Sequence, residues 1–460
     1  MAKIFLFNPA DERGQGFTRE GRCTQQAETW GTVWPPLSLA CAAAVLLADA
    51  HEVILTDYSA PAKNAQSPAE IAAAQKPDFA FWPTSTTTLS FDLSWAAAIK
   101  KASARTITGV FGTHITVDPA PALKDYFVDV VIRGEPEGVM ADLCRCAPQQ
   151  WHSVKGLSYR DAKAGKIISN PDHKFMAPEV IMPPAWHLLQ NLAYRLPLKR
   201  RRFLITAPVR GCPFSCSFCT ASIYYGSKPR FRPIAKVVEE IAQNVFLHAV
   251  KDYFIWADTF TLNRDYVKKF CEAILDRKLN VFWTCNSRVD TLDEKMLDLM
   301  KKAGCWMISF GIESGNDRIL AATGKGITTR QSRLAVQTAK KAGLKTAGHF
   351  MFGLPGETPS TMAETLELAL ALPLDIAQFY AATPFPGTKL YADALENNWL
   401  RLPAAMSQDQ AVMDLPGLPG RDVDAFRRRA YRKFYMRPRT AYGILSMIDP
   451  GAQIKSAFSG

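Results

Sequence analysis

Residues 203–219 read FLITAPVRGCPFSCSFC, in which a short apolar run is followed at once by three cysteines within eight residues. The run 203–207 has the length and side-chain content of a buried strand. Cys212, Cys216 and Cys219 fall on the loop after that strand. Three thiolates at this spacing can be brought onto one compact centre, so the stretch predicts a metal or redox site at a strand end.

Strands and helices alternate on the C-terminal side of the cysteine loop. We expect strands over residues 203–207, 252–257, 280–285, 306–310, 346–352 and 376–381. Helical stretches separate them, at 234–247, 264–277, 293–303 and 329–342. Six such repeats favour an incomplete βα barrel over a second open sheet, and barrel enzymes build their sites at the carboxyl ends of the strands.

The N-terminal part shows a similar alternation. We expect strands at 3–8, 52–57, 78–82, 106–111 and 128–132, with helices at 36–47 and 91–104. This predicts a doubly wound, Rossmann or flavodoxin-like parallel sheet, whose ligands bind beyond the carboxyl ends of the strands. Residues 151–184 read as a linker or small hairpin. The predicted α/β organisation is 1–148, a linker at 149–195, a partial (β/α)6 barrel at 196–395 and a basic helical region at 396–460.

Composition and charge narrow the class of protein. The 460 residues, 48% hydrophobic and 21% charged, exclude wholesale disorder and a disulfide-stapled miniprotein. The opening residues lack a secretory signal, and the longest apolar stretch, 37–48, falls short of the roughly 20 residues that cross a bilayer. We therefore expect a cytoplasmic protein whose ten cysteines serve metal or redox chemistry.

Much of the net charge of +12 falls in two basic blocks, residues 199–202 and 421–439. Either block is explained by a solvated face. The second interleaves Arg with Tyr and Phe, which suits an anionic lipid surface or lipid-like substrate, and equally an amphipathic helix with its aromatic face inward. RNA binding is disfavoured because no RNA-binding module accompanies the block.

The spacing of the cysteines favours an iron–sulfur cluster over a structural zinc site. Zinc would want a fourth ligand, and Cys271, Cys285 and Cys305 form no second spaced pair. An iron–sulfur cube held by three cysteines leaves one iron open for chemistry. The CxxxCxxC pattern after a first barrel strand looks like the radical S-adenosylmethionine (SAM) superfamily. That resemblance implies that the three thiolates hold a [4Fe–4S] cluster, that SAM chelates the open iron, and that an electron cleaves SAM to a 5′-deoxyadenosyl radical.

Further motifs carry the same resemblance at later strand ends. They are NSRVD at 286–290, GIESG at 311–315 and GLPGET at 353–358. The family's Gly-Gly-Glu after the second strand is missing, and Asp258 stands there instead. The resemblance thus assigns SAM contacts to Phe218, Asp258, Arg288, Glu313, Ser314, Gly353 and Glu357.

A flavodoxin-like sheet before such a barrel resembles the cobalamin-binding subclass of the superfamily. The resemblance assigns cobalamin contacts to Trp34, Pro36, Thr84, Ser85, Thr86, Gly112, Thr113, His114, Gly134 and Glu135. The Asp-x-His-x-x-Gly motif that supplies a lower cobalt ligand is absent, since the second strand is followed by Asp57-Tyr-Ser-Ala-Pro61. Methylcobalamin would therefore be bound base-off. A nucleotide site or a purely structural sheet remains an alternative.

The resemblance implies a methyltransferase that moves the methyl group of methylcobalamin to an unactivated carbon. The first alternative is a radical cyclase or oxidative ring-forming enzyme without methyl transfer, and a second, of another class, is a SAM- or cobalamin-binding regulator. The expected partners are a small-molecule or lipid-like substrate and a reductase such as flavodoxin or ferredoxin. We expect no nucleic acid, and peripheral membrane contact through the basic C-terminal region is a further expectation.

Overall fold

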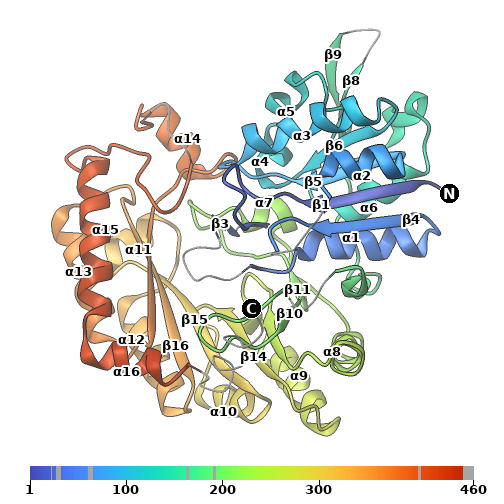
Figure 1. Ribbon diagram of the computed structural model, residues 1–460. Helices are drawn as coiled ribbons and strands as arrows, with labels where there is room; N and C mark the ends of the chain where they lie inside the picture. The colour runs from blue at the N-terminus through green and yellow to red at the C-terminus, as the bar shows by residue number, and fades with distance from the viewer. Residues whose placement is uncertain are drawn as a thin grey trace. The chain divides into compact units, whose positions relative to one another are not determined.

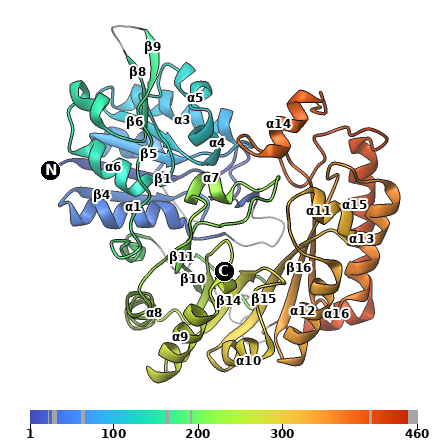
Figure 2. The same cartoon turned by 180° about the vertical axis from the view of Figure 1, so that it is seen from behind.

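The computed structural model describes residues 1–21, 23–26, 33–60, 66–161, 165–189, 193–401 and 406–448 (Figures 1 and 2). Its contacts divide the chain into two compact units. The first unit comprises Met1–Tyr194 together with Thr220–Ser227, and the second comprises Arg195–Cys219 together with Lys228–Gly460. A short segment directly after the cysteine loop thus belongs to the first unit.

The first unit is built on a seven-stranded sheet in the order β4-β1-β5-β6-β7-β8-β9. Its strands are β1 (Lys3–Asn8), β4 (Glu52–Asp57), β5 (Phe79–Pro83), β6 (Ile107–Phe111), β7 (Val130–Ile132), β8 (Leu157–Asp161) and β9 (Lys166–Ser169). The first five in the chain are parallel and follow the spatial order 2-1-3-4-5, which is the flavodoxin-like order and confirms the predicted fold class. β8 and β9 form an antiparallel hairpin that extends the sheet. Of the two interpretations of residues 151–184, linker or small hairpin, the hairpin is therefore the correct one for β8 and β9.

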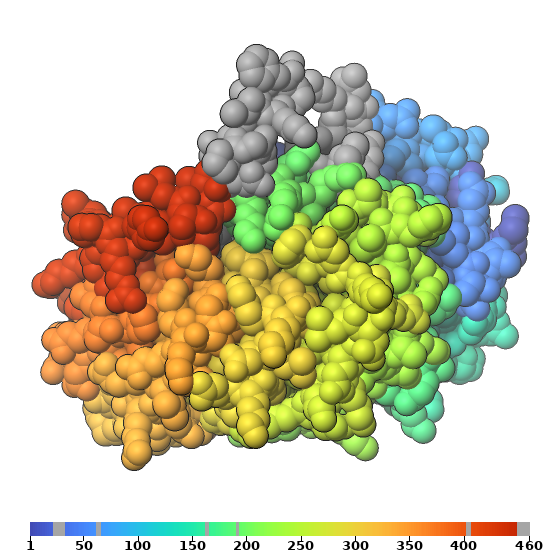
Figure 3. Space-filling model, turned by 90° about the horizontal axis from the view of Figure 1, so that it is seen from below, coloured from blue at the N-terminus to red at the C-terminus, as the bar shows by residue number. Residues whose placement is uncertain are grey.

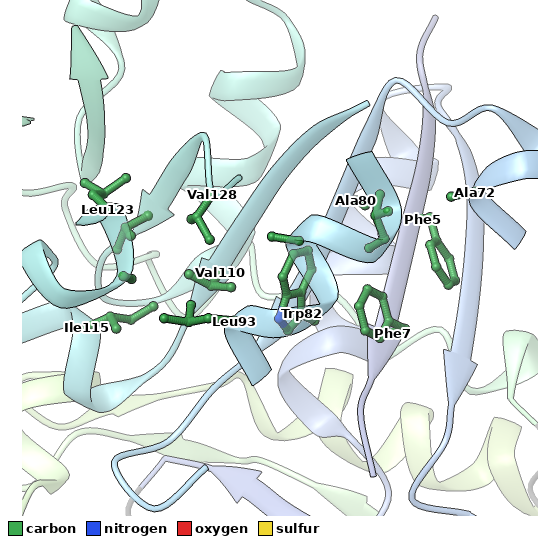
Figure 4. Close-up of a cluster of buried hydrophobic side chains, with 14 of the residues drawn as sticks. Phe5, Phe7, Ala72, Ala80, Trp82, Leu93, Val110, Ile115, Leu123 and Val128 are labelled. Atoms are coloured by element: carbon green, nitrogen blue, oxygen red, sulfur yellow. The ribbon is translucent and has the colours of Figure 1, made fainter. Parts of the chain in front are cut away.

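Helices cover this sheet through small and aromatic side chains. Helix α1 (Leu37–Ala48) is nearly all apolar and buried, as its Ala-rich sequence predicts. On α3 (Leu89–Ala102), Leu93, Ala96 and Ile99 recur at helical spacing and face the sheet. There they meet Trp82, whose ring stacks on Phe7 with centroids 5.0 Å apart (Figure 4). The core therefore lies beneath the strand ends at which ligands are expected.

A buried carboxylate closes the carboxyl end of β4. Asp57 accepts hydrogen bonds from Asn8 Nδ2 (2.9 Å), the Ser59 backbone N–H (2.9 Å) and Tyr194 Oη (2.8 Å). Burial raises the pKa of Asp57 to about 6, and these hydrogen bonds only partly oppose the rise. The carboxylate ties Tyr194, which ends the longer segment of the first unit, to the sheet of that unit.

This raised pKa makes stability depend on pH. Because the folded pKa of Asp57 lies above the unfolded value, its contribution is present at low pH and is lost as pH rises from about 4 to about 6. Between pH 7.5 and pH 4 we expect the wild type to gain up to about 3 kcal/mol in unfolding free energy relative to Asp57→Asn. Urea titrations of both proteins at the two pH values measure this, and an unchanged difference between them would contradict it.

The second unit contains six parallel strands paired in chain order, β10-β13-β14-β15-β16-β17. They are β10 (Phe203–Thr206), β13 (Asp252–Ile255), β14 (Phe282–Ser287), β15 (Cys305–Glu313), β16 (Lys345–Phe352) and β17 (Ile376–Ala381). The main connecting helices are α8 (Ile234–His248), α9 (Arg264–Asp276), α10 (Glu294–Lys302), α12 (Thr329–Lys341) and α13 (Pro359–Ala371). Side chains cap several of them; for instance, Asp293 accepts from the Met296 N–H at the start of α10. The predicted partial (β/α)6 barrel is confirmed. In the space-filling view of Figure 3, successive stretches of this unit, yellow-green to orange, lie side by side along one face.

The helix α15 (Gly420–Tyr435) packs on the outer face of β17. Phe379 of that strand meets the Tyr431 ring at 5.3 Å and the Phe434 ring at 6.1 Å. The cations of the helix are exposed instead, at Arg428, Arg429, Arg432 and Lys433. The aromatic residues of the basic block therefore belong to an inward-facing amphipathic helix. In the described chain, no helix is long and apolar enough to cross a membrane.

Candidate active site

The cysteine loop is anchored at its middle by backbone hydrogen bonds. It follows the short strand β11 (Val209–Arg210); Cys212 is buried, while Cys216 and Cys219 are half-buried. Ser217 donates its N–H to the Thr323 carbonyl (2.9 Å) and accepts from the Leu390 N–H at its own carbonyl (2.8 Å). The loop is thus fixed to the residue after α11 (Asp317–Ala322) and to the first turn of α14 (Lys389–Glu396).

An ion pair is built beside this loop from the end of β15. Lys325 Nζ lies 2.7 Å from Glu313 Oε1, and both side chains are about nine-tenths buried. Glu313 has a φ of +67° at the irregularity that ends the strand. A Cβ at Gly311 would stand only 2.7 Å from Glu313 Oε1 and 2.8 Å from Lys325 Nζ, so a side chain there would displace this ion pair. Gly324 is likewise close to the loop, because its Cβ would lie 3.0 Å from the Ser215 carbonyl oxygen.

The pKa of the Cys216 thiol depends on the charges of this ion pair and on those of other nearby groups. Burial raises its pKa, the cations of Lys325 and Arg288 oppose the rise, and Cys219 and Glu313 add to it. The cysteine loop and the predicted SAM residues Glu313 and Arg288 therefore lie in one electrostatic neighbourhood. No three His, Cys, Asp or Glu side chains of the described chain already form a metal site, so the three thiols share a loop without a closed ligand set.

Arg288 and Ser314 are both held by protein partners. The guanidinium of Arg288 donates from Nε and Nη2 to the two carboxylate oxygens of Asp290, both at 2.9 Å. It also stacks over the Phe214 ring of the cysteine loop at 3.6 Å. Ser314 is fully buried, and its Oγ accepts from the Asn316 N–H. Arg288 thus aims a cation at the cysteine loop, whereas Ser314 shapes the turn after β15.

Glu357 organises the loop that follows β16. Its Oε2 accepts from the backbone N–H of Gly353 (2.7 Å) and Leu354 (3.0 Å). Gly353 has a φ of +82°, which favours glycine. Burial raises the pKa of Glu357 to about 7, and its Oε1 has no hydrogen-bond partner in the described chain. The other two predicted SAM residues, Phe218 and Asp258, are half-buried, in the cysteine loop and after β13.

In the first unit, Thr84, Ser85 and Thr86 follow β5, next to the point where the strand order reverses between β1 and β5. The loop is tied inward by an ion pair, because Arg19 lies 2.8 Å from Asp92 with both side chains fully buried. Thr88 donates to Asp92 at 2.5 Å and contacts the Ser85 hydroxyl at 2.9 Å. The Ser85 hydroxyl is therefore engaged inside the protein.

His114 and Thr86 form a half-buried pair at the same edge of the sheet, with His114 Nδ1 3.1 Å from Thr86 Oγ1. Burial lowers the pKa of His114, so the neutral imidazole is favoured. Gly112 must be glycine because a Cβ would meet the Thr84 carbonyl oxygen at 2.1 Å. Thr113 donates to the Gly21 carbonyl.

The remaining predicted cobalamin residues are spread around this edge. Gly134, with a φ of +75°, has open space where a side chain would be, and Glu135 is buried and accepts from the Met176 N–H. Trp34 is half-buried, and Pro36 precedes α1. Lys325, Arg19 and Asp92 were not predicted from the sequence. Each is a charged residue beside a glycine turn or within an apolar stretch, and many solvated charged residues occur in the same sequence context.

Comparison with known proteins agrees with this arrangement. Residues 206–369 match the Radical SAM superfamily and residues 27–144 match the B12 binding domain. An uncharacterized methyltransferase of Pyrococcus horikoshii is 34% identical over 89% of this chain and 89% of its own length. The anaerobic magnesium-protoporphyrin IX monomethyl ester cyclase of Rubrivivax gelatinosus is 31% identical over 78% of this chain and 66% of its own length.

Solved structures share the fold. The radical SAM methyltransferase TsrM of Kitasatospora setae, solved with cobalamin and a [4Fe–4S] cluster, superposes with a TM-score of 0.71 at 16% identity, covering 98% of this chain and 90% of TsrM. The cobalamin-dependent SAM radical enzyme OxsB gives 0.67 at 18% identity, covering 86% of this chain and 55% of OxsB. The two family matches follow one another along the chain in the order expected from the sequence, and the Pyrococcus relative covers 89% of the chain. The chain therefore belongs to the radical SAM enzymes that carry a B12-binding domain.

Proposed function

We propose that this enzyme is a cobalamin-dependent radical SAM methyltransferase acting on an unactivated carbon of a small molecule. The observation that carries the proposal is the convergence of the cysteine loop with Glu313, Lys325 and Arg288 at one end of the half-barrel. The relatives support methyl transfer, since the Pyrococcus protein and the cytidylyl-2-hydroxyethylphosphonate methyltransferase of Streptomyces wedmorensis carry that name.

The donor set fits an iron–sulfur cluster. Thiolates are the ligands such clusters require, and three of them leave one iron open. Cys212, Cys216 and Cys219 would hold the cluster, with the loop drawing the thiolates together when iron and sulfide bind. When bound, the cluster and SAM supply one-electron cleavage and methylcobalamin supplies the methyl group. We propose that an electron carrier such as flavodoxin or ferredoxin reduces the cluster.

The residues around the thiols also fit SAM, which carries a carboxylate, an ammonium and a sulfonium. Arg288 and Lys325 place two cations beside the loop, and the two carboxylates of Asp258 and Glu313 follow β13 and end β15, on either side of β14. We infer that the cations orient the carboxylate of SAM while the acids receive its ammonium. We infer that the loop shaped by Glu357 contacts the adenosine.

The first unit fits cobalamin at the edge formed by Gly112, His114 and Gly134. At Gly134, where the space of a side chain is open, a bulky ring can approach the backbone closely, and the half-buried Thr86–His114 pair offers hydrogen bonds to its amide groups. The Asp57 carboxylate does not take the place of the missing histidine, because it is enclosed by Asn8, Ser59 and Tyr194. A base-off cobalamin without a histidine ligand follows from the proposal.

The test uses the reconstituted full-length enzyme without oxygen, supplied with SAM whose methyl group is deuterated and with a small-molecule extract of the source cells. We expect 5′-deoxyadenosine and one extract component that becomes heavier by a deuterated methyl group. Protein reconstituted without cobalamin is the control and should still cleave SAM. A component that loses hydrogen or gains a ring without a labelled methyl group would instead favour the cyclase, which the Rubrivivax relative also suggests.

Membrane contact is a separate proposal, made for the exposed side of α15 and the following helix α16 (Pro438–Leu445). Beside the exposed cations, Met436, Tyr442 and Leu445 expose 82%, 76% and 65% of their surface. Apolar and cationic side chains on one face are typical of helices that bind anionic lipid. We expect co-sedimentation with phosphatidylserine vesicles, lost in 0.5 M salt and in Arg428→Glu/Arg432→Glu, and absent with phosphatidylcholine. Equal recovery in the supernatant with both lipids would refute it.

A further inference from the structure

The two faces of the six-stranded sheet differ in how completely they are covered. On β15, the side chains that point toward the helices, Ile308 and Phe310, are 0% exposed. Side chains alternate along a strand, so the positions between them point to the inner face of the half-barrel. Several residues on the inner face keep 4–8% of their surface exposed, namely Phe254, Ser309, Ala347, Met351 and Ile376. Water therefore reaches the inner face of the second unit.

An amide and a hydroxyl face each other across two strands on this inner face. Asn286 on β14 is the register partner of Ser309 on β15. The residues on either side of Asn286 point outward, because Cys285 is fully buried and the Ser287 hydroxyl lies 2.5 Å from that of Thr261. Alternation along β14 therefore turns Asn286 toward the interior of the half-barrel, on the same side as Ser309.

Neither of these two side chains has a hydrogen-bond partner within the described part of the chain. Asn286 is half-buried and Ser309 is buried, so both polar groups lie in a largely apolar environment. The polar side chains of β16 and β17 on the same face differ, since His349, Gln378 and Tyr380 contact one another. A shielded amide and hydroxyl without protein partners cost free energy that a hydrogen-bonded ligand would offset. The pair is therefore better explained by a ligand than by the fold.

The pair lies beside the predicted SAM site. On β15, Gly311 follows Ser309 by two residues and points to the same face. The ion pair of Glu313 and Lys325 fills the space in which a side chain at Gly311 would stand. A strand rises about 3.3 Å per residue, so Ser309 lies about 7 Å along the strand from that level. A molecule held by Asn286 and Ser309 would therefore lie next to cofactors bound at the strand ends.

We propose that Asn286 and Ser309 bind the substrate by hydrogen bonds to a neutral polar group, such as a carbonyl, an amide or a hydroxyl. An amide and a hydroxyl each donate and accept, and neither carries a charge. On the same face, Phe254, Ala347 and Ile376 are apolar. The part of the substrate that enters the half-barrel is therefore an apolar body that carries this neutral group. The inference rests on the proposed function, and a polar pair that serves only the fold is the competing explanation.

The first test needs neither cofactor nor substrate and compares neighbouring residues that point in opposite directions. We expect Asn286→Leu to unfold at the wild-type urea concentration or a higher one, because it removes an amide that the fold leaves without a partner. Ser287→Ala is the matched control and should unfold at lower urea, since it loses contacts with the Thr261 hydroxyl and the Arg288 carbonyl. A midpoint that falls in Asn286→Leu as it does in Ser287→Ala would overturn the proposal.

The second test measures substrate binding, with the cell extract as the substrate source. We expect Asn286→Leu and Ser309→Ala to need about 3- to 10-fold more extract for half-maximal turnover, as the loss of a neutral hydrogen bond predicts. The SAM concentration for half-maximal turnover should not rise with it. Asn280→Leu makes the same substitution at an exposed asparagine before β14, and this control should match the wild type in both measurements.

Asn286→Asp tests the charge of the group that is bound. It keeps the shape of the side chain but places a carboxylate against a neutral group, so it should need more extract than the wild type. If Asn286→Asp instead needs less extract, the bound group is a cation and the assignment of a neutral group is overturned.

The outcomes keep the two proposals apart. If the wild type incorporates no labelled methyl group, the methyltransferase proposal fails, and the increase in 5′-deoxyadenosine caused by extract becomes the readout for Asn286. If Asn286→Leu and Ser309→Ala saturate at the wild-type extract concentration, the substrate-binding proposal fails whatever the reaction. If these variants need more SAM and no more extract, the pair belongs to the cofactor site, and substrate binding is refuted.

Discussion

Cys216→Ala is expected to abolish the iron–sulfur cluster and with it the reductive cleavage of SAM. Two remaining thiolates, Cys212 and Cys219, cannot hold three irons of a cube, and the described residues nearby offer a lysine, an arginine and a glutamate in place of a thiol. The loss should exceed the roughly 10- to 100-fold that altering a residue behind a metal ligand typically costs. Iron content, the cluster's visible absorbance and 5′-deoxyadenosine formation measure it.

The matched control is Ser215→Ala, one residue earlier on the same loop, where the side chain is exposed. It should keep both the cluster and SAM cleavage. Lys325→Met tests the buried ion pair and should fall within the 10- to 100-fold range, because it removes a charge beside the thiols but no ligand. Full iron content in Cys216→Ala would remove Cys216 from the ligand set.

Asp92→Ala is expected to destabilise the first unit by about 3–5 kcal/mol, since it leaves the guanidinium of Arg19 buried without its carboxylate. Arg19 would keep only acceptors such as the Pro9 and Ala10 carbonyls and the Thr88 hydroxyl. Hydrogen exchange followed by mass spectrometry resolves the effect by segment, so lost protection in β1, β5 and α3 can be separated from the second unit.

Replacing both charges tests the origin of this cost. Arg19→Met/Asp92→Leu removes the unpaired charge, and such substitutions of buried pairs are often neutral or stabilising. We expect it to recover most of the protection that Asp92→Ala loses. If Asp92→Ala exchanges like the wild type, the ion pair does not hold the loop after β5.

The sequence predicted the fold well because its strands are short apolar runs bounded by turn residues. Strands such as β1, β4 and β17 have the expected bounds, and others differ by a few residues, as where β15 extends to Glu313 through an irregular end. For β8 and β9 the sequence does not distinguish a hairpin from a linker. The reason is that Leu157–Asp161 is partly polar and pairs at the edge of the sheet.

The candidate site was less predictable than the fold. Contiguous motifs identified the cysteines and strand-end residues, yet the partners of those residues depend on tertiary contacts. Lys325 reaches Glu313 across a helix and a turn, and Arg19 reaches Asp92 from a segment 73 residues away in the chain. Ser85 shows the converse, since a hydroxyl expected to bind a ligand is engaged with Thr88 inside the protein.

The helix α7 (Ala221–Tyr225) has a consequence for how this enzyme can be divided or inherited. It begins two residues after Cys219 but belongs to the first unit, where it contacts α4 (Thr113–Val117). A gene fragment that encodes only the second unit would carry this helix without its neighbours, and one that ends at residue 194 would lack it. Recombination near residue 194 would therefore remove α7 from the first unit and leave it without its neighbours in the second. We expect the two units to be inherited together as a single gene segment.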